Sequence, residues 1–135
     1  MANAIYDKFK QARMTADSNI DLENGDVRVI LVDANDYTFS HAHDFLDDIP
    51  VGARVATSSA LTGKTVTDGV FDADNVTFSS VTGDQAEALV FYIHTGVEST
   101  SRLVAYIDTG ITGLPVTPSG SDITVSWNAS GIFKD

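Results

Sequence analysis

The sequence predicts a small, mainly β domain: a β-sandwich or jelly roll preceded by one short amphipathic helix. Short runs of β-branched and apolar residues recur at a spacing of roughly a dozen residues, and Gly, Asp, Asn or Ser separates them. The chain has 135 residues, of which 43% are hydrophobic and 20% charged, the usual composition of a single globular core. We expect one domain over residues 1–135, with the helix in 1–15, the sandwich in 25–128 and a C-terminal tail in 129–135.

The helix is predicted by apolar residues at helical spacing over residues 2–14. Ala2, Ile5, Tyr6, Phe9 and Ala12 fall on one face, and polar residues fill the other. The pattern breaks at residues 15–19, where turn formers gather. Such a helix either covers the end of the sheet or docks as an arm on a partner subunit.

The strands are predicted by composition and by the residues that bound them. Val27–Val32 is almost continuously apolar, which is typical of a strand covered on both faces. Ser40 is a plausible N-cap for a helical turn over Ser40–Leu46, which Pro50 would end. Residues 110–120 predict a surface connection between two late strands. The other predicted strands are Ala53–Thr57, Thr65–Phe71, Val76–Val81, Ala88–His94, Arg102–Asp108 and Ile123–Trp127.

One sequence pattern occurs twice. Leu89–Gly96 is echoed fourteen residues later by Leu103–Gly110. Because the offset is even, equivalent residues occupy the same phase of the two-residue strand repeat. The segment between them has the length of a hairpin loop, so we expect antiparallel neighbours in the centre of the sheet.

The charge balance excludes some partners. Lys and Arg number 8 and Asp and Glu number 19, so the formal net charge is −11. Nucleic acids and anionic membranes need basic surfaces, so neither is an expected partner. The chain has no cysteine, which excludes disulfides and Cys-ligated zinc. We also expect no signal peptide, and no apolar stretch approaches the ~18–20 residues of a membrane span.

Candidate catalytic and metal sites are weak in the sequence. Asp72–Asn75 resembles the start of a calcium loop but lacks its later glycine and glutamate, so a turn is the simpler interpretation. The sequence contains neither a nucleophile elbow nor a phosphate-binding glycine motif. We therefore expect no enzyme, no cofactor and no metal. The strongest metal candidates have poor ligand spacing and are interpreted as a solvated acidic surface: His41, His43, Asp44, Asp47 and Asp48.

Apolar residues near both ends of the chain are the candidates for a protein interface. Ile132 and Phe133 predict either a final strand or a contact with a neighbouring subunit. Trp127 shares a strand face with Ile123 and Val125, which favours a core anchor over a ligand platform. The predicted interface residues are Ile5, Tyr6, Phe9, Ile132 and Phe133.

Several stretches resemble a group of small structural proteins of tailed bacteriophages, in phrases spread over nearly the whole chain. They are Met1–Phe9, Val29–Asp33, Ala60–Val66, Phe71–Phe78, Gly113–Pro118, Ile123–Trp127 and Ile132–Lys134. The resemblance implies a virion protein, made in the host bacterial cytoplasm, that decorates and cements the head by binding across capsomers. It implies the major capsid protein, copies of the chain itself, or both as partners, and a homo-oligomer within the virion.

Other functions stay open beside decoration. A tail, neck or fibre-associated virion protein fits the same resemblance, and a β-sandwich can bind carbohydrates or a receptor through exposed aromatic side chains. A small hydrolase that uses carboxylates needs only suitable geometry. In the virion interpretation, the acidic faces point outward, and the basic and apolar residues near the termini meet the capsid.

Overall fold

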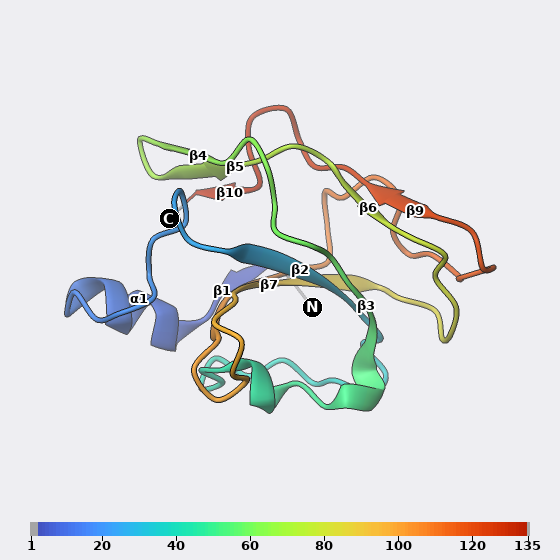
Figure 1. The fold of residues 1–135 in the computed structure, drawn as a ribbon, viewed down its shortest axis with the longest axis horizontal. Helices are drawn as coiled ribbons and strands as arrows, with labels where there is room; N and C mark the ends of the chain where they lie inside the picture. Colours follow the sequence, from blue (N-terminus) through green and yellow to red (C-terminus); the bar gives the residue numbers. More distant parts are fainter. Residues whose placement is uncertain (1–2, 135) are drawn as a thin grey trace.

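A five-stranded antiparallel sheet forms the centre of the molecule (Figure 1). The computed structural model describes residues 3–134. The three middle strands have almost wholly buried side chains, as their continuous apolar sequences predict. In spatial order the strands are β1 (Ala4–Ile5), β8 (Arg102–Ile107), β7 (Ala88–Ile93), β2 (Val27–Val32) and β3 (Arg54–Thr57).

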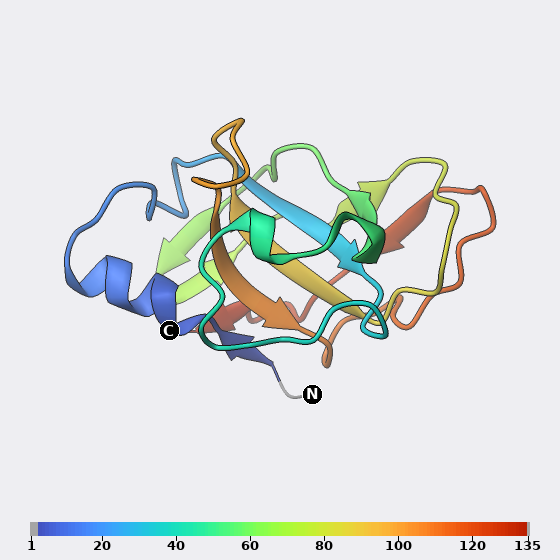
Figure 2. The ribbon, with the colours of Figure 1, turned by 90° about the horizontal axis from the view of Figure 1, so that it is seen from below.

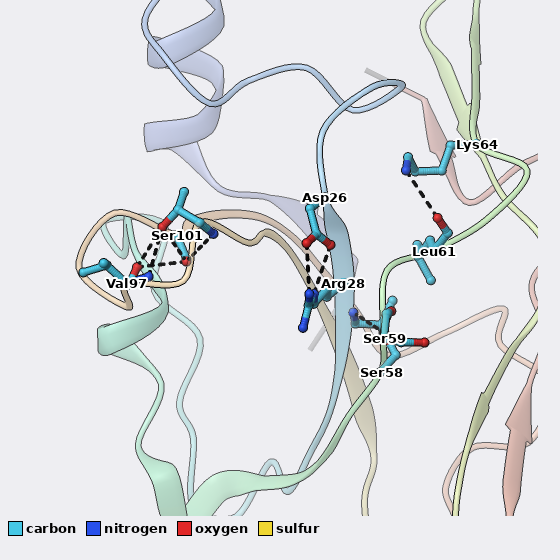
Figure 3. A network of polar contacts seen from close by, with 10 residues as sticks. Asp26, Arg28, Ser58, Ser59, Leu61, Lys64, Val97 and Ser101 are labelled. Atoms are coloured by element: carbon cyan, nitrogen blue, oxygen red, sulfur yellow. Dashed lines mark hydrogen bonds and ion pairs between the residues drawn. The ribbon is translucent and has the colours of Figure 1, made fainter.

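The echoed segments form the hairpin β7–β8, which confirms the predicted antiparallel pair. Leu89 pairs with Ile107 and Phe91 pairs with Ala105. At the tip, the Ser101 hydroxyl donates a hydrogen bond to the Val97 carbonyl at 2.9 Å (Figure 3). The hairpin therefore combines a buried, mostly apolar body with a polar, internally bonded turn.

Two small sheets cover one face of the central sheet (Figure 1). The first has the order β10 (Phe133–Lys134), β5 (Val70–Asp72) and β4 (Thr65–Thr67), and the second pairs β6 (Val76–Phe78) with β9 (Ile123–Val125). The mainly β fold class is thus confirmed. Because this second layer consists of two short sheets rather than one continuous sheet, the β-sandwich or jelly-roll arrangement stays a prediction.

Trp127 joins the two layers as a core anchor. Its ring centroid lies 5.8 Å from that of Phe91 in the central sheet. The indole N–H donates a hydrogen bond to the Ala73 carbonyl at 2.8 Å, which satisfies the polar atom of a half-buried ring. Residues 110–120 connect β8 to β9, as the sequence predicts.

The prediction of one strand over Thr65–Phe71 is wrong, because this segment is the β4–β5 hairpin. Asp68 and Gly69 occupy the turn with φ values of 52° and 81°. Two consecutive positive φ values are the signature of a type I′ turn, for which Asp-Gly is a favoured dipeptide. That dipeptide was the available signal for a hairpin.

The prediction of a helix from residue 2 is also wrong at its start. The helix α1 spans Asp7–Met14, and residues 4 and 5 instead form β1, paired with β8. The Tyr6 N–H donates to the Val104 carbonyl at 3.0 Å, so the chain leaves the sheet only at the residue before the helix. Backbone pairing to a sheet edge has overridden the helical pattern there. Ala2 lies outside the described residues.

An irregular segment, residues 33–53, covers the opposite face of the sheet (Figure 1). The helical turn predicted over Ser40–Leu46 is wrong: the Ser40 hydroxyl accepts the Ala42 N–H in a tight turn, and two 3₁₀ turns follow, η1 (Leu46–Asp48) and η2 (Val51–Ala53). Arg54 donates to the carbonyls of Leu46 and Ile49 and so anchors the segment to β3. No helix within residues 3–134 is long and apolar enough to cross a membrane.

Candidate functional site

The structure divides the five predicted interface residues between the core and the surface. Tyr6 and Phe9 are both 0% exposed, so their prediction as contact residues is corrected: they belong to the chain's own core. Ile5, Ile132 and Phe133 are half-buried and pack against that core. An amphipathic pattern identifies an apolar face but not whether its own sheet or a partner covers it.

Ile5 and Phe133, almost the whole chain apart in sequence, line one surface groove of about 490 Å³. We call it the terminal groove, because strands from both ends of the chain form it. Figure 2 shows the first and last strands approaching each other on one side of the molecule. Its lining residues are Asn3, Ala4, Ile5, Lys10, His41, Ala105, Ile107, Phe133 and Lys134.

The terminal groove lies where the central sheet and the small three-stranded sheet end. β1 is one of the two edge strands of the central sheet, and β10 is an edge strand of the small one. Ala105 and Ile107 of β8 form a buried apolar floor, and Phe133 forms part of the wall. The groove is therefore an open margin of the interlayer core, with apolar side chains already in place.

The charge around the terminal groove is opposite to that of the chain. Lys10, His41 and Lys134 line it, and no described lining residue is Asp or Glu. Asp7 lies just outside, with a carboxylate oxygen 3.9 Å from the Lys10 amine and 3.5 Å from His41 Nδ1. Both contacts are solvent-exposed, so they hold these side chains only weakly.

A second hollow of about 470 Å³ lies on the other side of Phe133. Arg13 lines it together with acidic and apolar residues from the segment before β2 and from the β4–β5 hairpin. Backbone and side-chain hydrogen bonds from Asn24 lower the pKa of the Asp21 carboxyl at its rim. Because this hollow mixes charges of both signs, its lining favours no particular ligand.

The predicted metal candidates are separated by their hydrogen bonds. His43 Nδ1 lies 2.8 Å from the Tyr37 hydroxyl, whereas His41 faces Asp7. Carboxylate oxygens of Asp44, Asp47 and Asp48 come within 4.8 Å of one another, without a histidine. Such a group of acidic side chains at the surface is not by itself a metal site.

The pKa values within this acidic group move in opposite directions. Burial and the neighbouring Asp48 raise the pKa of Asp44. Burial alone would also raise the pKa of Asp48, but hydrogen bonds from the Asp44 and Phe45 N–H groups outweigh it and lower that pKa. The Asp48 carboxylate thus caps the backbone at the start of η1, which is a structural role.

Two other acidic features also have structural partners. In the segment that resembles a calcium loop, the Asp72 carboxylate accepts the Ala73 N–H, and Asp74 accepts the Thr62 hydroxyl. This segment connects β5 and β6, in agreement with the predicted turn. Asp33, Asp36 and Asp84 form a second group of neighbouring carboxylates, and Asp33 accepts the Asn35 N–H.

A buried hydrogen-bond chain fixes the residues behind the terminal groove. The hydroxyls of Tyr6 and Tyr37 lie 2.9 Å apart, and the Tyr37 hydroxyl continues to His43. Burial raises the pKa of Tyr6 and raises that of Tyr37 to about 12, so both phenols stay neutral at physiological pH. Tyr6 thus ties the end of β1 to the segment over the opposite face.

Sequence reasoning located the apolar residues of the groove but not the polar residues of its rim as a set. Lys10, His41 and Lys134 lie on three separate segments, and only the fold brings them together. The basic and apolar residues near the two termini were the available signal in the sequence. In the structure, several of them line the terminal groove.

Comparison with known proteins adds no relative. The chain matches no family model and no curated protein.

Proposed function

We propose that the chain is a structural protein of a bacteriophage virion, most directly a head decoration protein that stabilises the shell by binding across capsomers. The observation that carries the proposal is the terminal groove. It joins Ile5 and Phe133 in one apolar surface, and its rim is cationic although the chain is strongly acidic. The phage-like stretches at both ends of the sequence contain these two residues.

A decoration protein needs contact area rather than chemistry. A specific association buries roughly 1,200–2,000 Å² in total, and repetition over a shell multiplies individually weak contacts through avidity. The terminal groove offers a place for such a contact, with the major capsid protein or another copy as partner. Enzymatic activity, a cofactor and nucleic-acid binding have no part in the proposal.

The orientation of the chain follows from its charge. With 19 acidic against 8 basic residues, most of the surface would be repelled by packaged DNA and is better placed outside the shell. The groove would then face the capsid and the acidic surface would face solvent. Acidic outer surfaces would also keep neighbouring particles apart.

The test is to purify particles of a phage whose genome encodes this chain and to measure its copy number by quantitative mass spectrometry and cryo-electron microscopy. We expect a copy number near that of the major capsid protein and density across capsomer boundaries. Absence from the particles would overturn the proposal. About a dozen copies would instead favour the neck or tail alternative, because those parts ring a single axis.

The carbohydrate-binding alternative receives less support from the geometry. A sugar site needs aromatic faces presented in a groove. The rings of Tyr37, Phe39 and Tyr106 do line a shallow hollow, but both tyrosines are 3% exposed and the rings pack on one another.

A further inference from the structure

We propose that the outer edge of β1 accepts an extended, acidic segment of a different protein chain, which adds to the central sheet as a further strand within the terminal groove. The inference rests on the proposed function, since it names the contact by which the chain would hold a shell. Three observations carry it: the free backbone of β1, the apolar floor and the cationic rim.

The backbone of β1 has an unused edge at Ile5. The Tyr6 N–H donates to the Val104 carbonyl, and Ile5 lies opposite Ala105. Hydrogen-bonded and non-hydrogen-bonded pairs alternate along an antiparallel ladder. Because Tyr6 is hydrogen-bonded to Val104, the next pair, Ile5 with Ala105, is a non-hydrogen-bonded one, and the N–H and C=O of Ile5 point away from β8. No bond from either group to a described residue is found. A strand laid along this edge would therefore gain backbone hydrogen bonds without displacing any.

The edge strand β4 of the small three-stranded sheet is protected. On β4, the Val66 N–H already donates to the Glu23 carboxylate at 3.3 Å, and a charged side chain on an edge discourages pairing. The corresponding edge of β1 opens into a groove instead. The difference indicates that β1, rather than β4, is suited to receive a strand.

The floor of the groove suits the alternating side chains of such a strand. Ile5 shares a sheet face with Ala105 and Phe91, its neighbours across the ladder. An added strand would place every second side chain over this face, beside Phe133. Apolar side chains at these positions would extend the interlayer core at its open margin.

The two lysines that line the terminal groove favour a strand with acidic side chains. The Lys10 and Lys134 amines line the groove, and carboxylates of an added strand would pair with them. The contact of Lys10 with Asp7, at 3.9 Å, is long and exposed enough to be exchanged. Copies of this chain carry −11 each and repel one another, which favours an acidic segment of a different chain over a second copy.

The first experiment titrates the isotope-labelled full chain with two six-residue peptides, one alternating valine with aspartate and one alternating valine with lysine. We expect NMR shifts confined to the terminal groove with the aspartate peptide only. At saturation, exchange of the Ile5 amide hydrogen should slow about tenfold or more, because that N–H acquires an acceptor. Binding of both peptides alike, binding without slower exchange at Ile5, or no binding would overturn the proposal.

Charge reversal tests the rim. The double variant Lys10→Glu/Lys134→Glu should weaken binding of the aspartate peptide about tenfold or more. Lys8→Glu/Lys64→Glu is the matched control, because it changes net charge by the same amount at two residues outside the groove, and it should change affinity less than about twofold. Equal losses in both variants would show a general charge effect and overturn the proposal. Amide spectra of each variant establish that it is folded.

Particle binding separates this inference from the proposed function. If the double variant decorates particles as well as the wild-type protein does, the groove contact is overturned but the virion role is left intact. Peptide binding at Ile5 combined with absence of the chain from purified particles would overturn the virion role but leave the groove contact intact. If the wild-type protein decorates particles and the double variant does not, the result supports both the groove contact and the virion role.

Discussion

Two hairpins of this protein are built on different physical principles. Every residue of β7 and β8 is buried, and the pair lies beside β2 within the central sheet. By contrast, all three residues of β4 are exposed, and the β4–β5 hairpin is joined by the tight Asp68–Gly69 turn. Burial therefore stabilises the first hairpin, whereas in the second the exposed strand β4 is held by turn geometry and by its pairing with β5.

The contrast shows where a small β domain can vary. A strand covered on both faces is mostly apolar, so its sequence has little freedom to encode a binding surface. The short strands at the margin of the second layer bury little and can be shaped around a groove. The terminal groove lies at such a margin, between the two-residue strands β1 and β10.

The largest effect is expected in the central hairpin. Phe91→Ala removes a ring that is 0% exposed and packs against Trp127, and it should lower the free energy of unfolding by about 3–5 kcal/mol. Urea denaturation measures the change. A loss below about 1 kcal/mol would contradict the view that burial holds this hairpin.

A smaller effect is expected where polar contacts hold the segment over the opposite face. Tyr37→Phe removes the hydroxyl between Tyr6 and His43 and leaves a buried phenol unpaired, so it should cost about 1–3 kcal/mol. Thermal unfolding measures it. Phe39→Leu, a change without a hydrogen bond to lose, is the comparison; an equal loss there would assign the effect to packing.

The surface hairpin should respond to its turn. Gly69→Ala forces a side chain into a position with φ of 81° and should cost about 1–2 kcal/mol by urea denaturation. Gly52→Ala is the matched control, since a Cβ there meets nothing within 4 Å and the backbone is not in the left-handed region. If both variants lost the same stability, the turn would not be what holds β4 to β5.

The smallest effects concern pH and have opposite signs at two aspartates. The hydrogen bond and charge of Arg28 lower the pKa of Asp26, whose usual value is 3.8, so this ion pair stabilises the fold at neutral pH and is lost on acidification below about 3.8 (Figure 3). Burial raises the pKa of Asp44, so its ionisation weakens the fold as pH rises above that value. We measure the thermal unfolding midpoint between pH 3 and 7. Compared with the wild type, the midpoint of Asp26→Asn should rise less with increasing pH, and that of Asp44→Asn should rise more steeply.

Finding the same pH dependence in both variants and in the wild type would contradict these two assignments. The comparison also has an internal control, because each substitution removes one carboxylate and changes net charge equally. A difference between the variants therefore reports local partners rather than overall charge.

The long apolar strands were predictable because their signal is strong and local. Val27–Val32 was predicted with the bounds that the structure shows, and the β7–β8 pair followed from an internal echo. The β4–β5 hairpin was missed, although its Asp-Gly dipeptide specifies the turn. The start of α1 was misplaced, because residues 4 and 5 form backbone bonds to β8 that no side-chain pattern reports.

The sequence alone determined the mainly β class, the identity of the central strands and the acidic surface, because these depend on composition and on periodicity within a few residues. Only the tertiary structure decided that Tyr6 and Phe9 are internal whereas Ile5 and Phe133 border a groove. It also decided that Lys10, His41 and Lys134 share one rim. The physical reason is that an apolar side chain is recognised by its chemistry, but whether its own chain covers it depends on contacts between residues far apart in sequence.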